Sequence, residues 1–251
     1  MTKTFDAAAA AHRLVSARMS GTPVASADVL PPDRAGAFAV QDATVAALGA
    51  VGGWKVGAKG PAAEPGCAPL PAAGLVGNDA VLTGPGWRMR GIEVEVAVRF
   101  ARDFIPAGPD AGRDAIVAAL DCVLPAIEVV ETRLADWRES DPLAQLADLQ
   151  THGALVLGAP SSVDAAGIDL RAVQAYLAFD GQPVATTRGG NTAGDIWRLL
   201  GWVAWQAVQR GRPLRAGDVV TTGSCTGMLF AGSGSQVVAN LAGIGDVQLR
   251  F

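Results

Sequence analysis

The chain contains few of the residues that define several large classes of protein. Among its 251 residues there are only three cysteines, Cys67, Cys122 and Cys225. Their number is odd and none of them forms a CxxC pair, so the sequence does not predict a disulfide framework.

The chain also lacks a large excess of charge of one sign and any long apolar run. Charged residues make up 18% of the chain, the formal net charge is −4, and lysines and arginines form no basic run. This composition argues against nucleic acid or an anionic membrane as a partner. No apolar stretch reaches the length of about 18 residues that a membrane span requires. Asp6, His12 and Arg13 interrupt the segment where a signal peptide would be apolar, so we expect a soluble, cytoplasmic protein.

Half of the residues are hydrophobic, which is enough for a large core. The patterning predicts an α+β protein, because strands and helices mix without strict βαβ alternation. A helical N-terminal lobe is expected over residues 1–50 and a β-rich catalytic domain over residues 51–251. Helices are expected at 4–20, 33–48, 112–123 and 194–210. Strands are expected at 53–56, 74–82, 91–100, 124–130, 155–157 and 175–179, and in the tail at 216–224, 235–241 and 245–251.

The stretch GIEVEVAVRF, residues 91–100, has two acidic residues on one face of a predicted strand. Side chains alternate along a strand, so Glu93 and Glu95 point the same way and repel each other unless a positive charge lies between them. One interpretation is an ordinary solvent-exposed face. The other is a pair of ligands for a hard divalent cation such as Mg²⁺ or Mn²⁺.

A third carboxylate lies in the apolar segment LPAIEVV. Glu128 is expected in a buried strand, where a charge is costly unless it is paired or bound to a metal. Its partner is either a basic residue, Arg133 or Lys55, or a cation shared with Glu93 and Glu95. Oxygen ligands without a neighbouring histidine favour Mg²⁺ over Zn²⁺.

Lys55, in GGWKVGAKG, is either a surface lysine on a turn or an inward-pointing residue of a short apolar strand. A desolvated lysine has a lowered pKa and can serve as an acid or a base. The loop is not a Walker motif, because it lacks the GK[ST] ending and no helix follows.

The segment TGSCTG resembles a nucleophile elbow with Cys225 at its centre. We reject that interpretation because no helix is expected after Cys225 and both histidines precede it. The backbone N–H groups of this glycine-rich turn are instead candidates for holding an anionic group. His152 stands alone, and a lone histidine is more often structural than catalytic.

Taken in order, these segments resemble the 2-keto-4-pentenoate hydratases of the fumarylacetoacetate hydrolase superfamily. The resemblance extends from about residue 38 to 251 and is carried by WKVG, IEVEVAV, LPAIEVVETRLADW, RPLRAGDVVTTGSCTG and GIGDVQLRF. It implies a fumarylacetoacetase-like mixed β-roll or distorted barrel flanked by helices, and a homo-oligomer. It also implies a Mg²⁺ or Mn²⁺ site at Glu93, Glu95 and Glu128, with Lys55 as a catalytic residue.

The implied reaction is the hydration of a 2-hydroxy-2,4-dienoate to a 4-hydroxy-2-oxo acid, as in the meta-cleavage catabolism of aromatic compounds. The substrate is a small 2-oxo acid that chelates the metal through its carboxylate and keto oxygens. The residues expected to contact it are Val56, Gly57, Asn78, Arg133, His152, Thr222, Gly223 and Ser224.

The sequence departs from the family pattern at two places. In GLVGNDA, the acidic catalytic position is taken either by Asn78 or, with a shift of one residue, by Asp79, which we assign as catalytic; such a shift reverses the face of a strand. In DLQTHG, Asp148 matches but Leu149 replaces a polar amide. Alternative functions are therefore decarboxylation of a 4-oxalocrotonate, C–C hydrolysis of an acylpyruvate, or a non-catalytic role in a complex with a partner decarboxylase.

Overall fold

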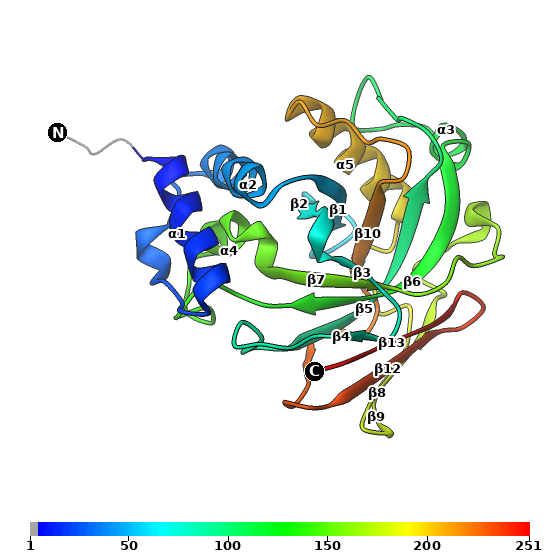
Figure 1. The fold of residues 1–251 in the computed structure, drawn as a ribbon. Coiled ribbons are helices and arrows are strands. Elements are labelled where there is room, and N and C mark those ends of the chain that lie inside the picture. The colour runs from blue at the N-terminus through cyan, green and yellow to red at the C-terminus, as the bar shows by residue number, and fades with distance from the viewer. Residues whose placement is uncertain (1–4) are drawn as a thin grey trace.

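Strand β5 (Gly91–Phe100) is at the centre of the larger of two sheets in the computed structural model, which describes residues 5–251 (Figure 1). The order in this sheet is β2-β1-β10-β5-β6-β7-β3, with β11 also pairing with β5. Its other strands are β1 (Val51–Gly57), β2 (Gly66–Pro71), β3 (Leu75–Gly77), β6 (Leu120–Val130), β7 (His152–Leu157), β10 (Val219–Ser224) and β11 (Leu229–Phe230).

The smaller sheet has the order β4-β13-β12-β8-β9. These strands are β4 (Ala80–Val81), β8 (Gln174–Phe179), β9 (Gln182–Arg188), β12 (Gln236–Leu241) and β13 (Gly245–Arg250). Each sheet contains both parallel and antiparallel pairs. The expected mixed fold is confirmed, and neither sheet closes into a barrel, because each ends in edge strands that do not pair with each other.

Four of the five α-helices in residues 5–251 begin at a capping aspartate. The helices are α1 (Ala7–Ser20), α2 (Arg34–Leu48), α3 (Arg113–Val117), α4 (Pro142–Ala147) and α5 (Ile196–Gln209), with short 3-10 turns at Ser26–Asp28, Ala72–Gly74, Leu149–Thr151 and Ala165–Gly167. Asp6, Asp33 and Asp195 accept backbone N–H groups of the first turns of α1, α2 and α5. Within residues 5–251, no helix combines the length and apolar character needed to cross a membrane.

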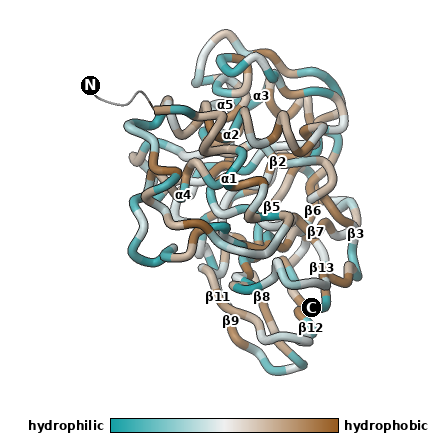
Figure 2. The backbone as a smooth tube through the Cα atoms, turned by 60° about the vertical axis from the view of Figure 1, so that its left-hand side comes forward, coloured by the Kyte–Doolittle hydropathy of each residue, from teal (hydrophilic) through white to brown (hydrophobic). Residues whose placement is uncertain are grey.

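The main core lies between the two sheets and α5. Leu199, Leu200 and Val203 of α5 are fully buried in the same cluster as Val94 and Val96 of β5. In Figures 1 and 2, α5 and the smaller sheet lie at opposite ends of the molecule. Burying the apolar stripe of α5 and one face of β5 together stabilises the sheet on which the acidic residues lie.

A second cluster holds the N-terminal helices. Leu14 of α1 and Val40 of α2 pack with Leu134 and with Ala147 of α4. Because α4 comes from the connection between β6 and β7, this helical group combines segments from both sides of residue 50. The division into residues 1–50 and 51–251 stays a prediction.

Several expected elements differ from the structure in extent or continuity. The strand expected over 74–82 is broken at Asn78 and Asp79: β3 pairs with β7 in the larger sheet, whereas β4 pairs with β13 in the smaller one. The helix expected over 112–123 ends at Val117, because Leu120 already pairs with Phe100 and tertiary pairing overrides the helical spacing. The helix expected over 4–20 starts at Ala7, and residue 4 of that prediction lies outside the described residues.

Candidate metal centre and active site

The three acidic residues singled out in the sequence lie together on one face of the larger sheet. Glu93 of β5 is directly opposite Glu128 of β6, and Glu95 follows two residues along β5. Each of the three offers a carboxylate oxygen, and these atoms all lie within 4.8 Å of one another. The antiparallel register of β5 and β6 therefore creates the cluster that the sequence predicted.

Glu95 is almost completely buried, at 1% exposure. Its Oε2 accepts hydrogen bonds from the Thr221 hydroxyl and from the backbone N–H of Gly223, the latter over 2.8 Å. The register of β10 with β5 shifts between Thr221 and Ser224, which brings the Gly223 N–H to this carboxylate. Gly223 has a φ of 89°, which glycine adopts without strain.

Glu128 has no exposed surface, and its two oxygens have different surroundings. Oε1 accepts a hydrogen bond from Lys55 Nζ over 2.5 Å and lies 3.1 Å from Nδ1 of His152. Oε2 is buried and has no hydrogen-bond partner among residues 5–251. Of the two basic residues considered as partners of Glu128, Lys55 forms the ion pair. Arg133 instead pairs with Asp148, at 2.5 Å between Nε and Oδ1.

The electrostatics of the cluster follow from burial and from repulsion between carboxylates. Burial, and then the charge of Glu128, raise the pKa of Glu93 to about 7, and raise the pKa of Glu95 well above its usual value. Burial opposes ionisation of Glu128 too, but Lys55 and His152 outweigh it and lower the pKa of Glu128.

The pKa of Lys55 shifts in the opposite direction to the one expected for a desolvated lysine. Burial alone would lower its pKa, but Glu128, Glu93 and Glu95 outweigh burial, so the pKa of Lys55 is raised. Lys55 is therefore a charged ammonium group at neutral pH rather than a neutral amine. Burial lowers the pKa of His152 to about 4, so its imidazole is neutral at pH 7. Because a carboxylate only accepts hydrogen bonds, we assign the imidazole proton to Nδ1, which lies 3.1 Å from Glu128 Oε1.

The chemistry of the cluster fits a hard divalent cation. Three buried or half-buried carboxylates face only one lysine, and one oxygen of Glu128 lacks any partner. A cation among them would relieve the repulsion and satisfy that oxygen. The donors are all oxygens, which suits Mg²⁺ or Mn²⁺.

The cluster opens into a cavity of about 710 Å³. Five of the residues predicted to contact substrate line it, namely Val56, Gly57, Thr222, Gly223 and Ser224, together with Lys55 and the three glutamates. The volume is sufficient for a small organic acid with several carbon atoms.

Four predicted site residues do not line this cavity. Arg133 and His152 lie behind it: Arg133 is held by Asp148, and His152 is fully buried against Glu128. Asn78 and Asp79 lie in the exposed turn between β3 and β4, where both hydrogen-bond to Gln248. The chain crosses here from one sheet to the other, so the structure does not place Asn78 or Asp79 in the lining of the cavity that holds the three glutamates. The catalytic assignment of Asp79 stays a prediction.

Several residues that line the cavity were not expected from the sequence, and two of them make hydrogen bonds that shape the site. Gln150 lines the cavity, its carbonyl accepts a hydrogen bond from Lys55 over 3.0 Å, and its side-chain Oε1 is buried without a partner among the described residues. Asn191 donates to the carbonyls of Thr222 and Gly223 and so supports the irregular end of β10.

The amino-acid sequence contains only weak signals that Gln150 and Asn191 belong to the site. Leu149, Gln150 and Thr151 all have positive φ, at 48°, 53° and 60°, although none is a glycine or an asparagine. Such backbone costs of order 1–3 kcal/mol per residue and is concentrated at functional sites, but the letters DLQTHG do not reveal it. Asn191 follows a glycine pair, which indicates only a turn.

Cys225 is fully buried, and burial raises the pKa of its thiol to about 12. It is therefore not an activated nucleophile.

The comparisons with known proteins agree on one family. The protein-family model described as Fumarylacetoacetate (FAA) hydrolase C-terminal matches residues 38–251. A 2-keto-4-pentenoate hydratase of Paraburkholderia xenovorans is 30% identical over 160 residues, which cover 64% of this chain and 58% of that protein. The 2-keto-4-pentenoate hydratase 2 of Dechloromonas aromatica is 30% identical over 265 aligned positions that cover both chains fully.

Among solved structures, a 4-oxalocrotonate decarboxylase from Pseudomonas putida G7, complexed with magnesium and adipate, superposes with a TM-score of 0.85. The sequence identity is 22% and the superposition covers both chains completely. A second structure of that decarboxylase, complexed with calcium and acetate, gives a TM-score of 0.84.

Proposed function

The chain belongs to the fumarylacetoacetate hydrolase family, and on this basis we propose that it is a metal-dependent hydratase that acts on a 2-hydroxy-2,4-dienoate. The observation that carries the proposal is the cluster of Glu93, Glu95 and Glu128 beside Lys55 in one cavity. The names of the relatives, 2-keto-4-pentenoate hydratase and 2-hydroxyhexa-2,4-dienoate hydratase, support this substrate class.

Glu93, Glu95 and Glu128 would hold Mg²⁺ or Mn²⁺ in this cavity. When bound, such a cation supplies Lewis-acid polarisation of carboxylate and keto oxygens. The protein supplies the rest: Thr221 and Gly223 orient Glu95, while Lys55 and His152 orient Glu128. These outer contacts set the direction in which each carboxylate presents its free oxygen.

Lys55 is the proton donor that the geometry favours. Its ammonium group is charged at neutral pH and lies at the wall of the cavity. In the proposed hydration, the enol proton leaves the substrate, C5 gains a proton, and water adds its hydroxyl to C4 and its hydrogen to C3. Each of these transfers needs a group that holds a proton at a defined place, and Lys55 is the charged acid beside the carboxylates.

A second candidate function, decarboxylation of a 4-oxalocrotonate, is favoured by a further cation in the cavity. Lys59 lines the same cavity and has no ion pair or side-chain hydrogen bond within residues 5–251. A substrate with a second carboxylate would find this positive charge at a distance from the glutamates. The similar decarboxylase structure is complexed with magnesium and adipate, which is a dicarboxylate.

One pair of assays tests both functions. We expect the protein, stripped of metal and resupplied with Mg²⁺ or Mn²⁺, to remove the ultraviolet absorbance of 2-hydroxypenta-2,4-dienoate. Consumption of 4-oxalocrotonate with release of CO₂, and no reaction of the dienoate, would instead establish the decarboxylase. Inactivity on both, with metal bound, would favour the non-catalytic role. The homo-oligomer and the complex with a partner decarboxylase stay predictions.

A further inference from the structure

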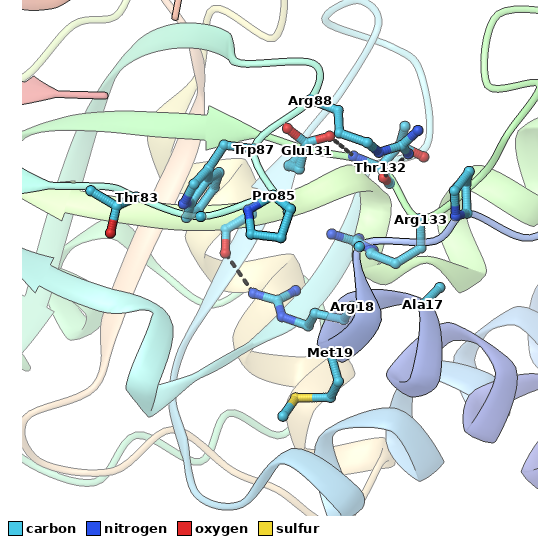
Figure 3. Close-up of a pocket in the computed structure, with 15 residues that line it drawn as sticks. Ala17, Arg18, Met19, Thr83, Pro85, Trp87, Arg88, Glu131, Thr132 and Arg133 are labelled. Atoms are coloured by element: carbon cyan, nitrogen blue, oxygen red, sulfur yellow. Dashed lines mark hydrogen bonds between the residues drawn. The ribbon is translucent and has the colours of Figure 1, made fainter. Parts of the chain in front are cut away.

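A second cavity, of about 270 Å³, lies outside the metal centre, between the end of α1 and the segment that follows β4 (Figure 3). Its walls come from residues 17–23, 83–88 and 131–133 and from Gly153. Figure 3 shows Arg18 extending from α1 toward Pro85, with Trp87 and Arg133 nearby. None of the three clustered glutamates lines this cavity.

The charges around this cavity are unbalanced. Arg18, Arg88 and Arg133 line it, against a single carboxylate, Glu131. Arg133 is paired with Asp148. In the described part of the chain, neither Arg18 nor Arg88 has a carboxylate within 4.0 Å. The partly buried guanidinium of Arg18 lacks an anionic partner, and an anion in the cavity would supply one.

Two guanidinium groups meet at one carbonyl oxygen. Arg18 Nη1 and Arg133 Nη1 both donate to the carbonyl of His152, over 3.2 Å and 2.7 Å. Burial, and then repulsion from Arg133, lower the pKa of Arg18 to about 10, so it remains charged at neutral pH. Like charges held this close favour a negative group between or beside them, as the repelling glutamates favour a cation.

Arg18 is already fixed in position. Besides the His152 carbonyl, it donates through Nη2 to the carbonyl of Gly153 over 2.6 Å. A guanidinium carries five N–H donors, so donors remain for a ligand. Because its side chain is ordered beforehand, binding an anion does not require a further loss of rotamer freedom.

Two features oppose an anion, and both are weak here. Glu131 is negative, but its oxygens already accept the backbone N–H groups of Met89, Arg90 and Thr132. The C-terminal end of α1 carries a partial negative charge, which the Gly21 N–H reduces by capping the Ala17 carbonyl. Arg18 and Arg88, the two guanidinium groups of the cavity without a carboxylate partner among residues 5–251, outweigh these contributions.

We propose that this cavity is a second binding site, for a small organic carboxylate. The planar fork of a guanidinium matches a carboxylate, and the ring of Trp87 gives the carbon skeleton an apolar wall. The volume admits an acid of a few carbon atoms. The site is separate from the metal centre, so its ligand does not need a metal.

Succinate binding to the metal-stripped protein, measured by titration calorimetry, tests the site. We expect saturable binding of one succinate per chain, weakened at least tenfold in Arg18→Met and at least threefold in Arg88→Met. Two variants should bind like the wild type: Lys59→Met, in the metal cavity, and Arg102→Gln, an exposed arginine elsewhere.

Two results would overturn the proposal: no succinate binding to the wild-type protein, or binding that is lost in Lys59→Met and kept in Arg88→Met. Circular dichroism checks the fold of each variant. Arg88 is exposed and makes one hydrogen bond, to the Thr132 carbonyl, so its replacement tests the site even where Arg18→Met does not fold.

Discussion

Lys55 and Glu128 form a buried ion pair, with 2.5 Å between Nζ and Oε1, although two strands separate them in the sheet. Lys55 is on β1 and Glu128 is on β6, with β10 and β5 between them. Three strand spacings correspond to about 14 Å in a flat sheet. The two side chains therefore reach toward each other over β5, where Glu93 and Glu95 lie, and all four charges share one cavity.

The first prediction concerns Lys55→Met. Removing the ammonium group leaves Glu128 as a buried charge without a cation, which costs about 3–5 kcal/mol when no metal is present. We expect a lower Tm for the metal-free variant, a larger rise in Tm on adding Mn²⁺ than in the wild type, and turnover reduced at least hundredfold. Differential scanning calorimetry with and without Mn²⁺ measures the first two effects. Lys59→Met, an exposed lysine of the same cavity, is the control and should keep the wild-type Tm.

The second prediction concerns the carboxylates. Glu128→Gln removes one of the three proposed oxygen ligands and should weaken Mn²⁺ binding by about a hundredfold or more, since even partners outside the ligand shell contribute 10- to 100-fold. Calorimetric titration of Mn²⁺ measures the change. Glu139→Gln, at an exposed position, should bind Mn²⁺ like the wild type. Wild-type affinity in Glu128→Gln would place the metal elsewhere.

The third prediction is a pH dependence of metal affinity. The pKa of Glu93 is raised to about 7, chiefly by burial. Below that pH a proton competes with the cation, so the apparent Mn²⁺ affinity should rise as the pH increases from 5 toward 7 and level off above it. Calorimetric titrations at pH 5.5, 6.5 and 7.5 follow this change. Because Glu95 also has a raised pKa, the Glu93→Gln variant should keep part of the pH dependence of Mn²⁺ affinity. A wild-type Mn²⁺ affinity that does not change with pH would contradict the prediction.

The fourth prediction concerns Gln150, which lines the metal cavity. If it donates one hydrogen bond to the substrate, Gln150→Ala removes about 0.5–1.5 kcal/mol of binding, which corresponds to a KM between about two- and tenfold higher. We expect little change in kcat, because the Gln150 carbonyl that holds Lys55 is retained. Steady-state kinetics separates KM from kcat. Gln236→Ala, at an exposed position of β12, is the control, and an unchanged KM in Gln150→Ala would remove the amide from the site.

The fifth prediction concerns the strand that carries Lys55. A Cβ atom at Gly53 would lie 2.0 Å from the Val219 carbonyl oxygen on β10, so Gly53→Ala must push β1 away from its neighbour. We expect a loss of about 3 kcal/mol in the free energy of unfolding, at the upper end of overpacking effects. Urea denaturation of the metal-free protein measures it. Gly77→Ala, where a Cβ would meet nothing within 4 Å, should stay within about 0.5 kcal/mol of the wild type.

Much of the fold is readable from local patterns. The alternation in residues 91–100 predicted β5 with its observed limits, and the apolar stripe between Gly194 and Arg210 predicted α5 within two residues at its start and one at its end. These patterns succeed because the face that a side chain occupies depends only on the period of its own element. The same reasoning placed Glu93 and Glu95 on one face and identified Glu128 as a costly charge in a buried strand.

The tertiary structure decided which of these residues meet. The register of β5 with β6 sets Glu93 opposite Glu128, and the strand order brings Lys55, rather than Arg133, to Glu128. The tertiary structure also places Asp79 outside the lining of the cavity and Gln150 within it. Residue types and periodicity determined the candidate ligands on their own. Their partners and the pKa values of the cluster depend on contacts between strands far apart in the chain, because burial and Coulomb interactions act through space and not along the sequence.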